Sequence, residues 1–236
     1  MVGQAGLALG LIGACILVGV ADAGEEPALT RARQLMVERQ LRARDITDVA
    51  VLKAMGKVPR HLFVTPGFVG EAYNDYPLPI GEGQTISQPY IVALMTQVLA
   101  LTGSEKVLEV GTGSGYQAAV LAEIVRRVFS IEILPGLAAS AAARLKNLGY
   151  ETIQVRAGDG YQGWPEEAPF DAIIVTAGAT HIPRPLADQL REGGRLVIPV
   201  GGGGHQELLL GTKVRGNLAT RPIAPVRFVP LLEPTR

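Results

Sequence analysis

The spacing of apolar and polar residues between positions 106 and 200 predicts short buried strands separated by helices. Apolar runs typical of strands buried on both faces lie at 106–110, 128–131, 152–156, 171–175 and 195–200. Helical periodicity is found at 116–125, 135–148 and 185–190. Two further apolar runs, at 207–213 and 226–230, predict an antiparallel pair at one edge. Strands that alternate with helices form a doubly wound, mostly parallel sheet, which binds ligands at the carboxyl ends of its strands.

The N-terminal part of the chain carries a different pattern. Residues 30–44 are rich in charges, with apolar residues on one side, and predict an amphipathic helix. A second helix is expected to begin at the capping residue Asp48, and a third to span 91–101. Between them, 60–90 is dense in Gly, Pro, Tyr and Asn and has little periodicity. So long a stretch without regular structure is usually functional.

The loop after the strand at 106–110 holds three glycines at alternate positions, Gly111, Gly113 and Gly115. Glycine lets the backbone turn sharply and lets a ligand approach the main chain closely. A dinucleotide-binding loop has the spacing G-x-G-x-x-G, whereas here Gly115 comes one residue early. The observed E-x-G-x-G-x-G resembles the loop of S-adenosylmethionine-dependent methyltransferases. A glycine-rich turn that only connects a strand to a helix is the simpler alternative.

Three acidic residues follow successive predicted strands. Glu109 ends the first strand, Glu132 ends the second, and Asp159 follows the third. Because the carboxyl ends of parallel strands meet at one edge, we expect these acids beside the glycine loop. Glu132 stands where an acid binds ribose hydroxyls, and Asp159 is placed to accept from an adenine amino group. Taken singly, each acid has a second interpretation as a helix cap or a surface residue.

Composition narrows the class of protein. A length of 236 residues suits one domain with additions, and 47% hydrophobic with 5% aromatic residues is typical of α/β folds. The formal net charge is zero, which argues against a nucleic-acid partner. The three histidines lack the spacing of zinc ligands, and the single cysteine excludes an internal disulfide. We therefore expect no metal.

Residues 1–23 form a separate apolar segment. The run from Ala5 to Ala21 is followed by an A-x-A-like site, which favours a secretory signal peptide cleaved after Ala23. Against this interpretation, no Lys or Arg precedes the apolar run. A start site placed too far upstream is another explanation.

Two further segments resemble one family of methyltransferases closely. Residues 83–90 read Gly-Gln-Thr-Ile-Ser-Gln-Pro-Tyr, and 226–231 read Val-Arg-Phe-Val-Pro-Leu. Together with the glycine loop and Gly158-Asp159-Gly160, they are similar to segments of the protein-L-isoaspartate O-methyltransferases. The apolar N-terminus is unusual for a family that normally works in the cytoplasm.

The resemblance implies a Rossmann-like S-adenosylmethionine-dependent methyltransferase fold with an N-terminal helical extension and an antiparallel edge. The implied activity is methyl transfer from S-adenosylmethionine to the free α-carboxyl of L-isoaspartyl residues in damaged proteins and peptides. The ester then closes to a succinimide, and hydrolysis returns part of the material to aspartate. We expect one domain over 24–236, with a helical, substrate-side subregion at 24–100 and a cofactor-binding core at 101–236.

The implied chemistry needs few catalytic groups. A carboxylate is already ionised at pH 7, so no general base is required, and positioning and exclusion of water lower the barrier. By the resemblance, Ser87 is the active-site serine, whose hydroxyl orients the substrate carboxylate or the cofactor. An N-cap of the following helix is the alternative for Ser87. The predicted cofactor-binding residues are Thr85, Ile86, Ser87, Glu109, Gly111, Gly113, Gly115, Glu132, Asp159 and Gly160.

Residues 226–231 resemble the family's substrate-side strand, which is expected to pair with an extended peptide. An ordinary edge strand is the competing interpretation. The expected partners are isoaspartyl-containing proteins and peptides, with no nucleic acid and no stable membrane partner, and we expect a monomer. S-adenosylmethionine is made in the cytosol, which favours a cytoplasmic enzyme over an exported, periplasmic one.

The main rival function is a methyltransferase for a small metabolite, against which residues 77–90 argue. An NAD-dependent oxidoreductase is disfavoured by the glycine spacing. A binding module that has lost turnover is disfavoured because Ser87, Asp159 and the three glycines are intact.

Overall fold

The computed structural model describes residues 1–2, 26–202 and 204–234. The signal-like segment expected at 1–23 therefore lies almost wholly outside the described residues. Within the described ranges, none of the helices is long and apolar enough to cross a membrane.

The main sheet has seven strands in the order β5-β4-β3-β6-β7-β8-β9. Its parallel strands are β3 (Lys106–Val110), β4 (Arg127–Glu132), β5 (Ile153–Ala157), β6 (Phe170–Val175) and β7 (Leu190–Gly202). Two antiparallel strands, β8 (His205–Val214) and β9 (Asn217–Val226), extend the sheet beyond β7. The chain builds outward from β3 to β5 and then returns to β6 on the other side of β3. The predicted doubly wound sheet with an antiparallel edge is confirmed, and its topological switch point lies between β3 and β6.

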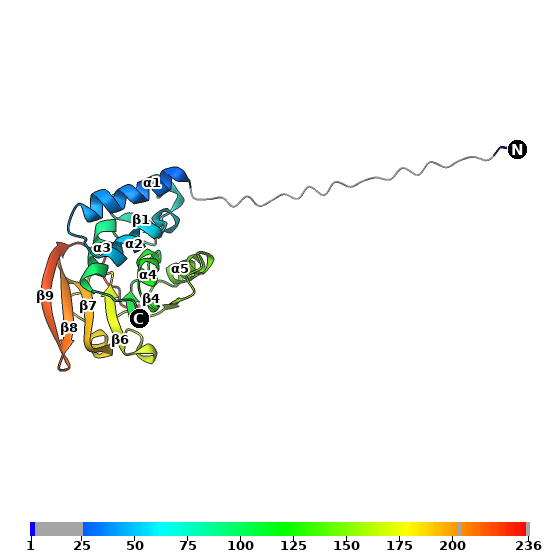
Figure 1. Cartoon of the computed structure of the whole chain (residues 1–236). Helices are drawn as coiled ribbons and strands as arrows, with labels where there is room; N and C mark the ends of the chain where they lie inside the picture. Colours follow the sequence, from blue (N-terminus) through cyan, green and yellow to red (C-terminus); the bar gives the residue numbers. More distant parts are fainter. Residues whose placement is uncertain (3–25, 203, 235–236) are drawn as a thin grey trace.

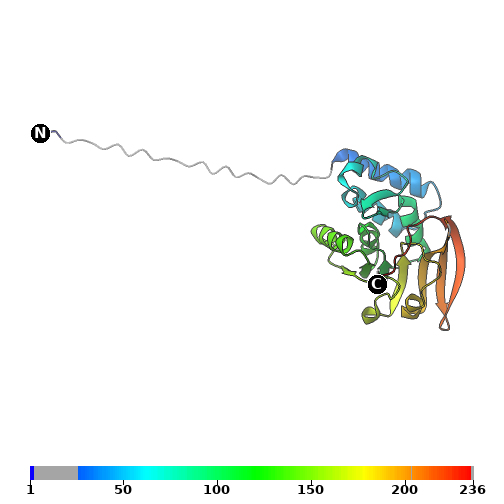
Figure 2. The same cartoon turned by 180° about the vertical axis from the view of Figure 1, so that it is seen from behind.

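Helices cover both faces of this sheet. The N-terminal part contributes α1 (Pro27–Met36), its π-helical continuation η1 (Val37–Arg42), α2 (Val49–Lys57) and α3 (Pro89–Val98). The core contributes α4 (Tyr116–Ala122), α5 (Pro135–Asn147) and α6 (Arg184–Gln189). The predicted cap of α2 is confirmed, because the Asp48 carboxylate accepts from Ala50 N at 2.8 Å and from Val51 N at 3.1 Å. The N-terminal helices group at one end of the molecule, and β8 and β9 form its outer edge (Figures 1 and 2).

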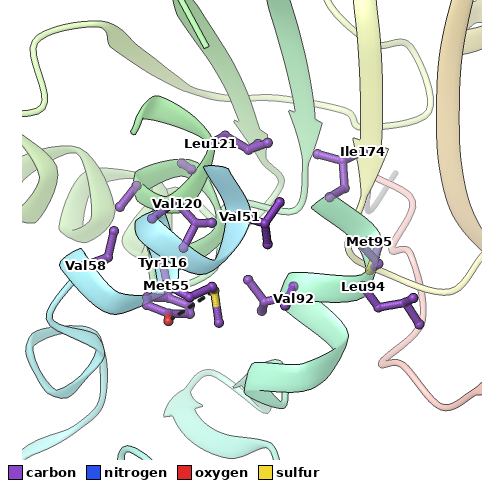
Figure 3. Packing of buried hydrophobic residues seen from close by; sticks show 14 of the residues in the cluster. Val51, Met55, Val58, Val92, Leu94, Met95, Tyr116, Val120, Leu121 and Ile174 are labelled. Atoms are coloured by element: carbon purple, nitrogen blue, oxygen red, sulfur yellow. Dashed lines mark hydrogen bonds between the residues drawn. The ribbon is translucent and has the colours of Figure 1, made fainter. Parts of the chain in front are cut away.

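The N-terminal helices share a hydrophobic core with the sheet. Met55 of α2 lies against Tyr116 of α4, and Met95 of α3 and Ile174 of β6 belong to the same cluster (Figure 3). Tyr116 at the start of α4 is 1% exposed, and its hydroxyl lies 3.7 Å from the sulfur of Met55. The opposite face of the sheet buries a second cluster, which includes Leu186 of α6. Burial on both faces explains why the strands read as continuous apolar runs.

Two parts of the chain differ from the expected elements. The stretch 60–90, expected to be irregular, contains the 3₁₀ turns η2 (Arg60–Phe63) and η3 (Pro66–Glu71) and an antiparallel hairpin of β1 (Leu78–Gly81) with β2 (Gln84–Ile86). Strands this short carry too few residues to show a period. A third 3₁₀ turn, η4 (Pro165–Glu167), precedes β6.

The prediction of an edge strand at 226–230 is wrong. The edge strand is β9, which ends at Val226, and the chain then leaves the edge and crosses the carboxyl ends of the parallel strands. Pro222 and Pro225 interrupt the apolar pattern of β9, so the sequence pattern did not predict a strand there. We call residues 227–232 the strap.

Candidate active site

A cavity lies at the carboxyl ends of the parallel strands, beside the switch point. It encloses about 750 Å³ of space between protein atoms, part of it open to solvent. One wall is the glycine loop together with the end of β4, and the opposite wall consists of residues 84–87 and the end of the strap. The position agrees with the place where doubly wound sheets bind ligands. We call it the inner cavity.

The three predicted glycines have left-handed backbones but different neighbours. Gly111 has a φ of +98°, and a Cβ there would lie 2.5 Å from Thr176 Oγ1. Gly113 has a φ of +52°, and both residues line the inner cavity. Gly115 instead precedes α4 and faces α5, where a Cβ would lie 3.2 Å from Leu145. The third glycine thus serves the packing of a helix and does not line the cavity wall.

Glu132 at the end of β4 holds the glycine loop from the side. Its Oε2 accepts from Gly113 N at 2.8 Å, and its Oε1 accepts from Leu134 N at 3.1 Å. The residue lines the inner cavity and is 6% exposed. Each carboxylate oxygen can accept a second hydrogen bond, so the carboxylate can still bind a hydroxyl of a ligand.

Glu109 lies outside the cavity wall. Successive residues of a strand point to opposite faces, so Glu109 shares the face of Val107, which packs beneath the helices. Its carboxylate accepts from Ser130 Oγ, which is hydrogen-bonded at 2.6 Å to Thr112 Oγ1 of the glycine loop. Burial raises the pKa of the Glu109 carboxyl to about 8, against the lowering effect of the Ser130 hydrogen bond. Glu109 therefore reaches the loop only through two hydroxyls.

Asp159 and Gly160 follow β5 but differ in their relation to the cavity. Asp159 Oδ1 accepts from Tyr161 N at 2.8 Å, which fixes the turn, and the residue does not line the inner cavity. Gly160 does line it, and a Cβ there would lie 2.5 Å from Val110 Cγ1. Of the ten predicted cofactor-binding residues, the structure brings together Thr85, Ile86, Ser87, Gly111, Gly113, Glu132 and Gly160.

Ser87 stands at the entrance to α3 and lines the inner cavity. The N-cap position of α3 is Gln88, one residue later, and Ser87 makes no capping hydrogen bond among the described residues. The capping role falls to Asp75, whose Oδ1 accepts from Tyr90 N at 3.2 Å. Its Oδ2 accepts from Gln88 Nε2 at 2.8 Å and from Arg44 at 3.1 Å. Asp75 thereby ties residues 87–90 to the preceding loop and leaves the Ser87 hydroxyl available to a ligand.

The strap is fastened to the sheet by two residues that the sequence did not single out. Gly178 N donates to Val229 O at 2.8 Å, and Leu231 N donates to Gly178 O at 2.7 Å. The side-chain amide of Gln206 pairs with the main chain of Phe228, since Phe228 N donates to Oε1 at 2.6 Å and Nε2 donates to Phe228 O at 3.2 Å. A Cβ at Gly178 would overlap the Gln206 amide, so a side chain there would push that amide away from Phe228.

A second, outer cavity of about 1500 Å³ adjoins the first and is more open to solvent. The two cavities share Thr85, Ser87, Thr176 and Val229. Thr176 directly follows β6, and its hydroxyl donates to Gly111 O at 2.7 Å. The position of Thr176 at the end of a predicted strand was the one feature of the sequence that could have identified it as a site residue. Two ligands, one in each cavity, would meet at this shared wall, which is an arrangement suited to group transfer.

The described residues hold no group of three or more His, Cys, Asp or Glu side chains that could bind a metal ion.

Comparisons with known proteins identify relatives over most of the chain. The family model described as Protein-L-isoaspartate(D-aspartate) O-methyltransferase (PCMT) matches residues 31–236. A protein-L-isoaspartate O-methyltransferase of Opitutus terrae is 58% identical over 223 residues, which cover 94% of this chain and 96% of the relative.

Solved structures show the same likeness. One protein-L-isoaspartate O-methyltransferase has a TM-score of 0.78 at 31% identity and covers 84% of this chain and 65% of its own. A second, from Plasmodium falciparum, was solved in complex with S-adenosyl-L-homocysteine. It has a TM-score of 0.74 at 28% identity and covers 85% of this chain and 98% of its own.

Proposed function

The chain belongs to the protein-L-isoaspartate O-methyltransferase family, and from this premise we propose how its two cavities perform the reaction. The protein is an S-adenosylmethionine-dependent enzyme that methylates the free α-carboxyl of L-isoaspartyl residues in damaged proteins and peptides. Methylation starts repair, because the ester closes to a succinimide that hydrolyses in part to normal aspartate.

The inner cavity fits the cofactor. Gly111, Gly113 and Gly160 line the inner cavity and carry no side chain, so a ligand can lie directly on the main chain. The Glu132 carboxylate has acceptor capacity left for ribose hydroxyls. Thr85 and Ile86 close the other side. Bound S-adenosylmethionine supplies an electrophilic methyl group on a positively charged sulfur.

We assign the outer cavity to the damaged peptide and the shared wall to the point of transfer. The isoaspartyl carboxylate is ionised at neutral pH, so the protein has to orient it and exclude water but does not have to remove a proton. The Ser87 hydroxyl is half-buried at the shared wall and is free to donate a hydrogen bond to that carboxylate. Ser87 is thus a hydrogen-bond donor in this proposal and not a nucleophile.

The remaining predicted residues act indirectly. Gly115 packs α4 against α5, Asp159 shapes the turn that presents Gly160, and Glu109 supports the glycine loop through Ser130. We further propose one domain over 24–236, with the substrate side in 24–100 and the cofactor-binding core in 101–236, acting as a monomer. A cytoplasmic location follows from the supply of the methyl donor, with export through residues 1–23 as the alternative.

The single observation that carries the assignment is the wall shared by the two cavities at Ser87 and Thr176. The test supplies labelled S-adenosylmethionine and two peptides that differ only in one isoaspartyl or aspartyl linkage. Base-labile label on the isoaspartyl peptide alone is expected. If the protein binds the cofactor but labels neither peptide, the substrate assignment fails and a small metabolite becomes the better candidate.

A further inference from the structure

The outer cavity has one charged residue in its wall, Arg227 of the strap. Every other residue that lines it is a proline, an apolar residue or an uncharged threonine, serine or glutamine. We infer that Arg227 makes the enzyme prefer isoaspartyl sites that have an acidic side chain close by in the sequence. This inference rests on the proposed function, because it assumes that the peptide occupies the outer cavity.

No residue in the described part of the chain neutralises the charge of Arg227. The residue is exposed and forms no hydrogen bond or ion pair with any of the described residues. On the neighbouring strand β8, Glu207 lies opposite Pro225, two residues before Arg227, and makes no ion pair with it. Asp75, which contacts the wall residue Gln88 but does not line the cavity, already has its carboxylate paired with Arg44 and Gln88. A peptide therefore enters a cavity whose net local charge is positive.

The backbone at Arg227 is held in place, so its charge has a defined position. Val226 ends β9 in register with Gln206, and Phe228 is bonded to the Gln206 amide. Val229, two residues further on, belongs to the wall shared by both cavities. Two extended residues span roughly 6.6 Å, which places the Arg227 backbone beside the neighbours of the isoaspartyl residue and away from the reacting carboxylate.

The expected size of the preference for acidic neighbours is small, because the Arg227 side chain is exposed to solvent. Attraction between exposed charges is weak, and it extends about 10 Å at 0.1 M salt. An acidic flank is expected to raise kcat/KM about twofold to fivefold over a basic one, which is the range of exposed ion pairs. The preference is expected to vanish near 1 M salt, where screening shortens the range to about 3 Å.

The experiment measures kcat/KM for isoaspartyl peptides that carry Glu, Gln or Lys at one flanking position, taken in turn on either side of the isoaspartyl residue. In the native enzyme, the Glu peptide is expected to exceed the Lys peptide at one or more positions. Arg227→Gln is expected to bring the ratio near one, and Arg227→Glu to invert it. Because each ratio is taken within one variant, a partial loss of folded enzyme cancels.

Arg221→Glu is the matched control. Arg221 is also exposed, lies on β9 and lines neither the inner nor the outer cavity, so the same change of charge there is expected to leave the ratio unchanged. An equal effect of both variants would overturn the inference, because the cause would then be the general field of the protein. A uniform loss for all peptides in the Arg227 variants would overturn it too, because Arg227 would then bind the isoaspartyl carboxylate itself.

The two levels of the proposal fail differently. If no isoaspartyl peptide is methylated, the proposed function is wrong. If all are methylated without regard to the flanking charge, only the role of Arg227 is wrong. Should Arg227→Glu fail to fold, Arg227→Gln decides: a ratio near one supports the inference, and a ratio equal to that of the native enzyme overturns it.

Discussion

The two walls of the inner cavity are built in different ways. The glycine-loop wall comes from one short piece of chain, in which strand β3, the loop and the end of β4 are bonded directly to one another. The opposite wall joins residues 84–87 to the strap, which lies more than a hundred residues later. Its parts are held by distant side chains, namely Asp75 on one segment and Gln206 on the other.

This difference indicates that the two walls have separate functions, one in binding the cofactor and the other in binding the peptide. Local bonding gives the glycine-loop wall a shape that does not depend on the rest of the site, which suits a cofactor that never varies. The opposite wall is joined from separate segments through Asp75, Gln206 and Gly178, and it borders the outer cavity, where peptides of many sequences must fit. Changes in the first wall should therefore act on cofactor binding and stability, and changes in the second on peptide kinetics.

The largest expected effect concerns Glu109, beneath the glycine-loop wall. Because burial raises its pKa from 4.5 to about 8, the folded protein holds a proton that the unfolded chain releases above pH 4.5. Its contribution to stability is therefore fully present below pH 4.5 and is lost as the pH rises to about 8. The free energy of unfolding should fall by up to about 1.4 kcal/mol per pH unit in that window, relative to Glu109→Gln.

Urea unfolding of the native protein and of Glu109→Gln at pH 5, 6, 7 and 8 measures this difference. Glutamine has nearly the same shape as glutamate and stays neutral. The variant should therefore keep the fold, and its free energy of unfolding should lack the fall with pH that Glu109 causes. The matched control is Glu151→Gln, at an exposed surface position, where the pH dependence should follow the native protein. Parallel curves for native protein and Glu109→Gln would mean that Glu109 is ionised in the fold.

The second prediction breaks the glycine-loop wall directly. In Gly111→Ala, an alanine has to adopt the left-handed backbone of Gly111, which costs about 1–2 kcal/mol. Its new Cβ would lie 2.5 Å from Thr176 Oγ1, so the Thr176 hydroxyl has to move. We expect a loss of S-adenosylmethionine affinity of roughly thirtyfold, which corresponds to about 2 kcal/mol, measured by titration calorimetry. Gly149→Ala has the same left-handed strain at φ +80° but open space around it, and should leave affinity unchanged. Equal affinities in the two variants would contradict a steric cause.

The sequence predicts the glycine-loop wall better than the opposite one for the same physical reason. The strand at 106–110 was predicted correctly, and Gly111 and Glu132 lie together as expected, because their contacts lie within the single strand–helix–strand unit from β3 to β4. What failed there was side-chain direction: Glu109 ends a strand as expected, yet the alternation of the strand turns it away from the cavity. A pattern of residue types does not say which face of a strand the last side chain takes.

The opposite wall depends on contacts that no local pattern contains. The hairpin of β1 and β2 has too few residues to show a period, and the prolines of β9 concealed an edge strand. The strap was expected to be that strand, because its apolar residues resemble one. Its true position depends on Gln206 and Gly178, which are isolated residues without a motif.

The third prediction tests Ser87, which faces both cavities. Ser87→Ala removes a hydroxyl that makes no hydrogen bond within the described residues, so the free energy of unfolding should change by less than about 0.5 kcal/mol. Loss of a hydrogen bond to a charged carboxylate should lower kcat/KM for an isoaspartyl peptide about tenfold, with cofactor affinity nearly preserved. Ser140→Ala, at an exposed position of α5, is the control. Unchanged turnover in Ser87→Ala would remove the serine from the mechanism.

The smallest expected effect sharpens the comparison most, because it acts on the opposite wall from outside the cavities. Gln206→Ala removes the two hydrogen bonds that hold Phe228 and leaves the lining of both cavities intact. The strap is then held only at Gly178, and the KM for peptide should rise about threefold to fivefold. This rise corresponds to the loss of about 0.5–1.5 kcal/mol, the net contribution of a typical hydrogen bond.

Steady-state kinetics with a single isoaspartyl peptide, together with the dissociation constant for S-adenosylmethionine, separates the two walls in Gln206→Ala. Gln154→Ala, on the exposed side of β5 at the far edge of the sheet, removes the same group without touching the strap and should match the native enzyme. A rise in peptide KM with unchanged cofactor affinity would show that the walls are independent. An equal loss of both would show that the strap also shapes the cofactor site, since Val229 and Leu231 line the inner cavity, and the division of duties would then fail.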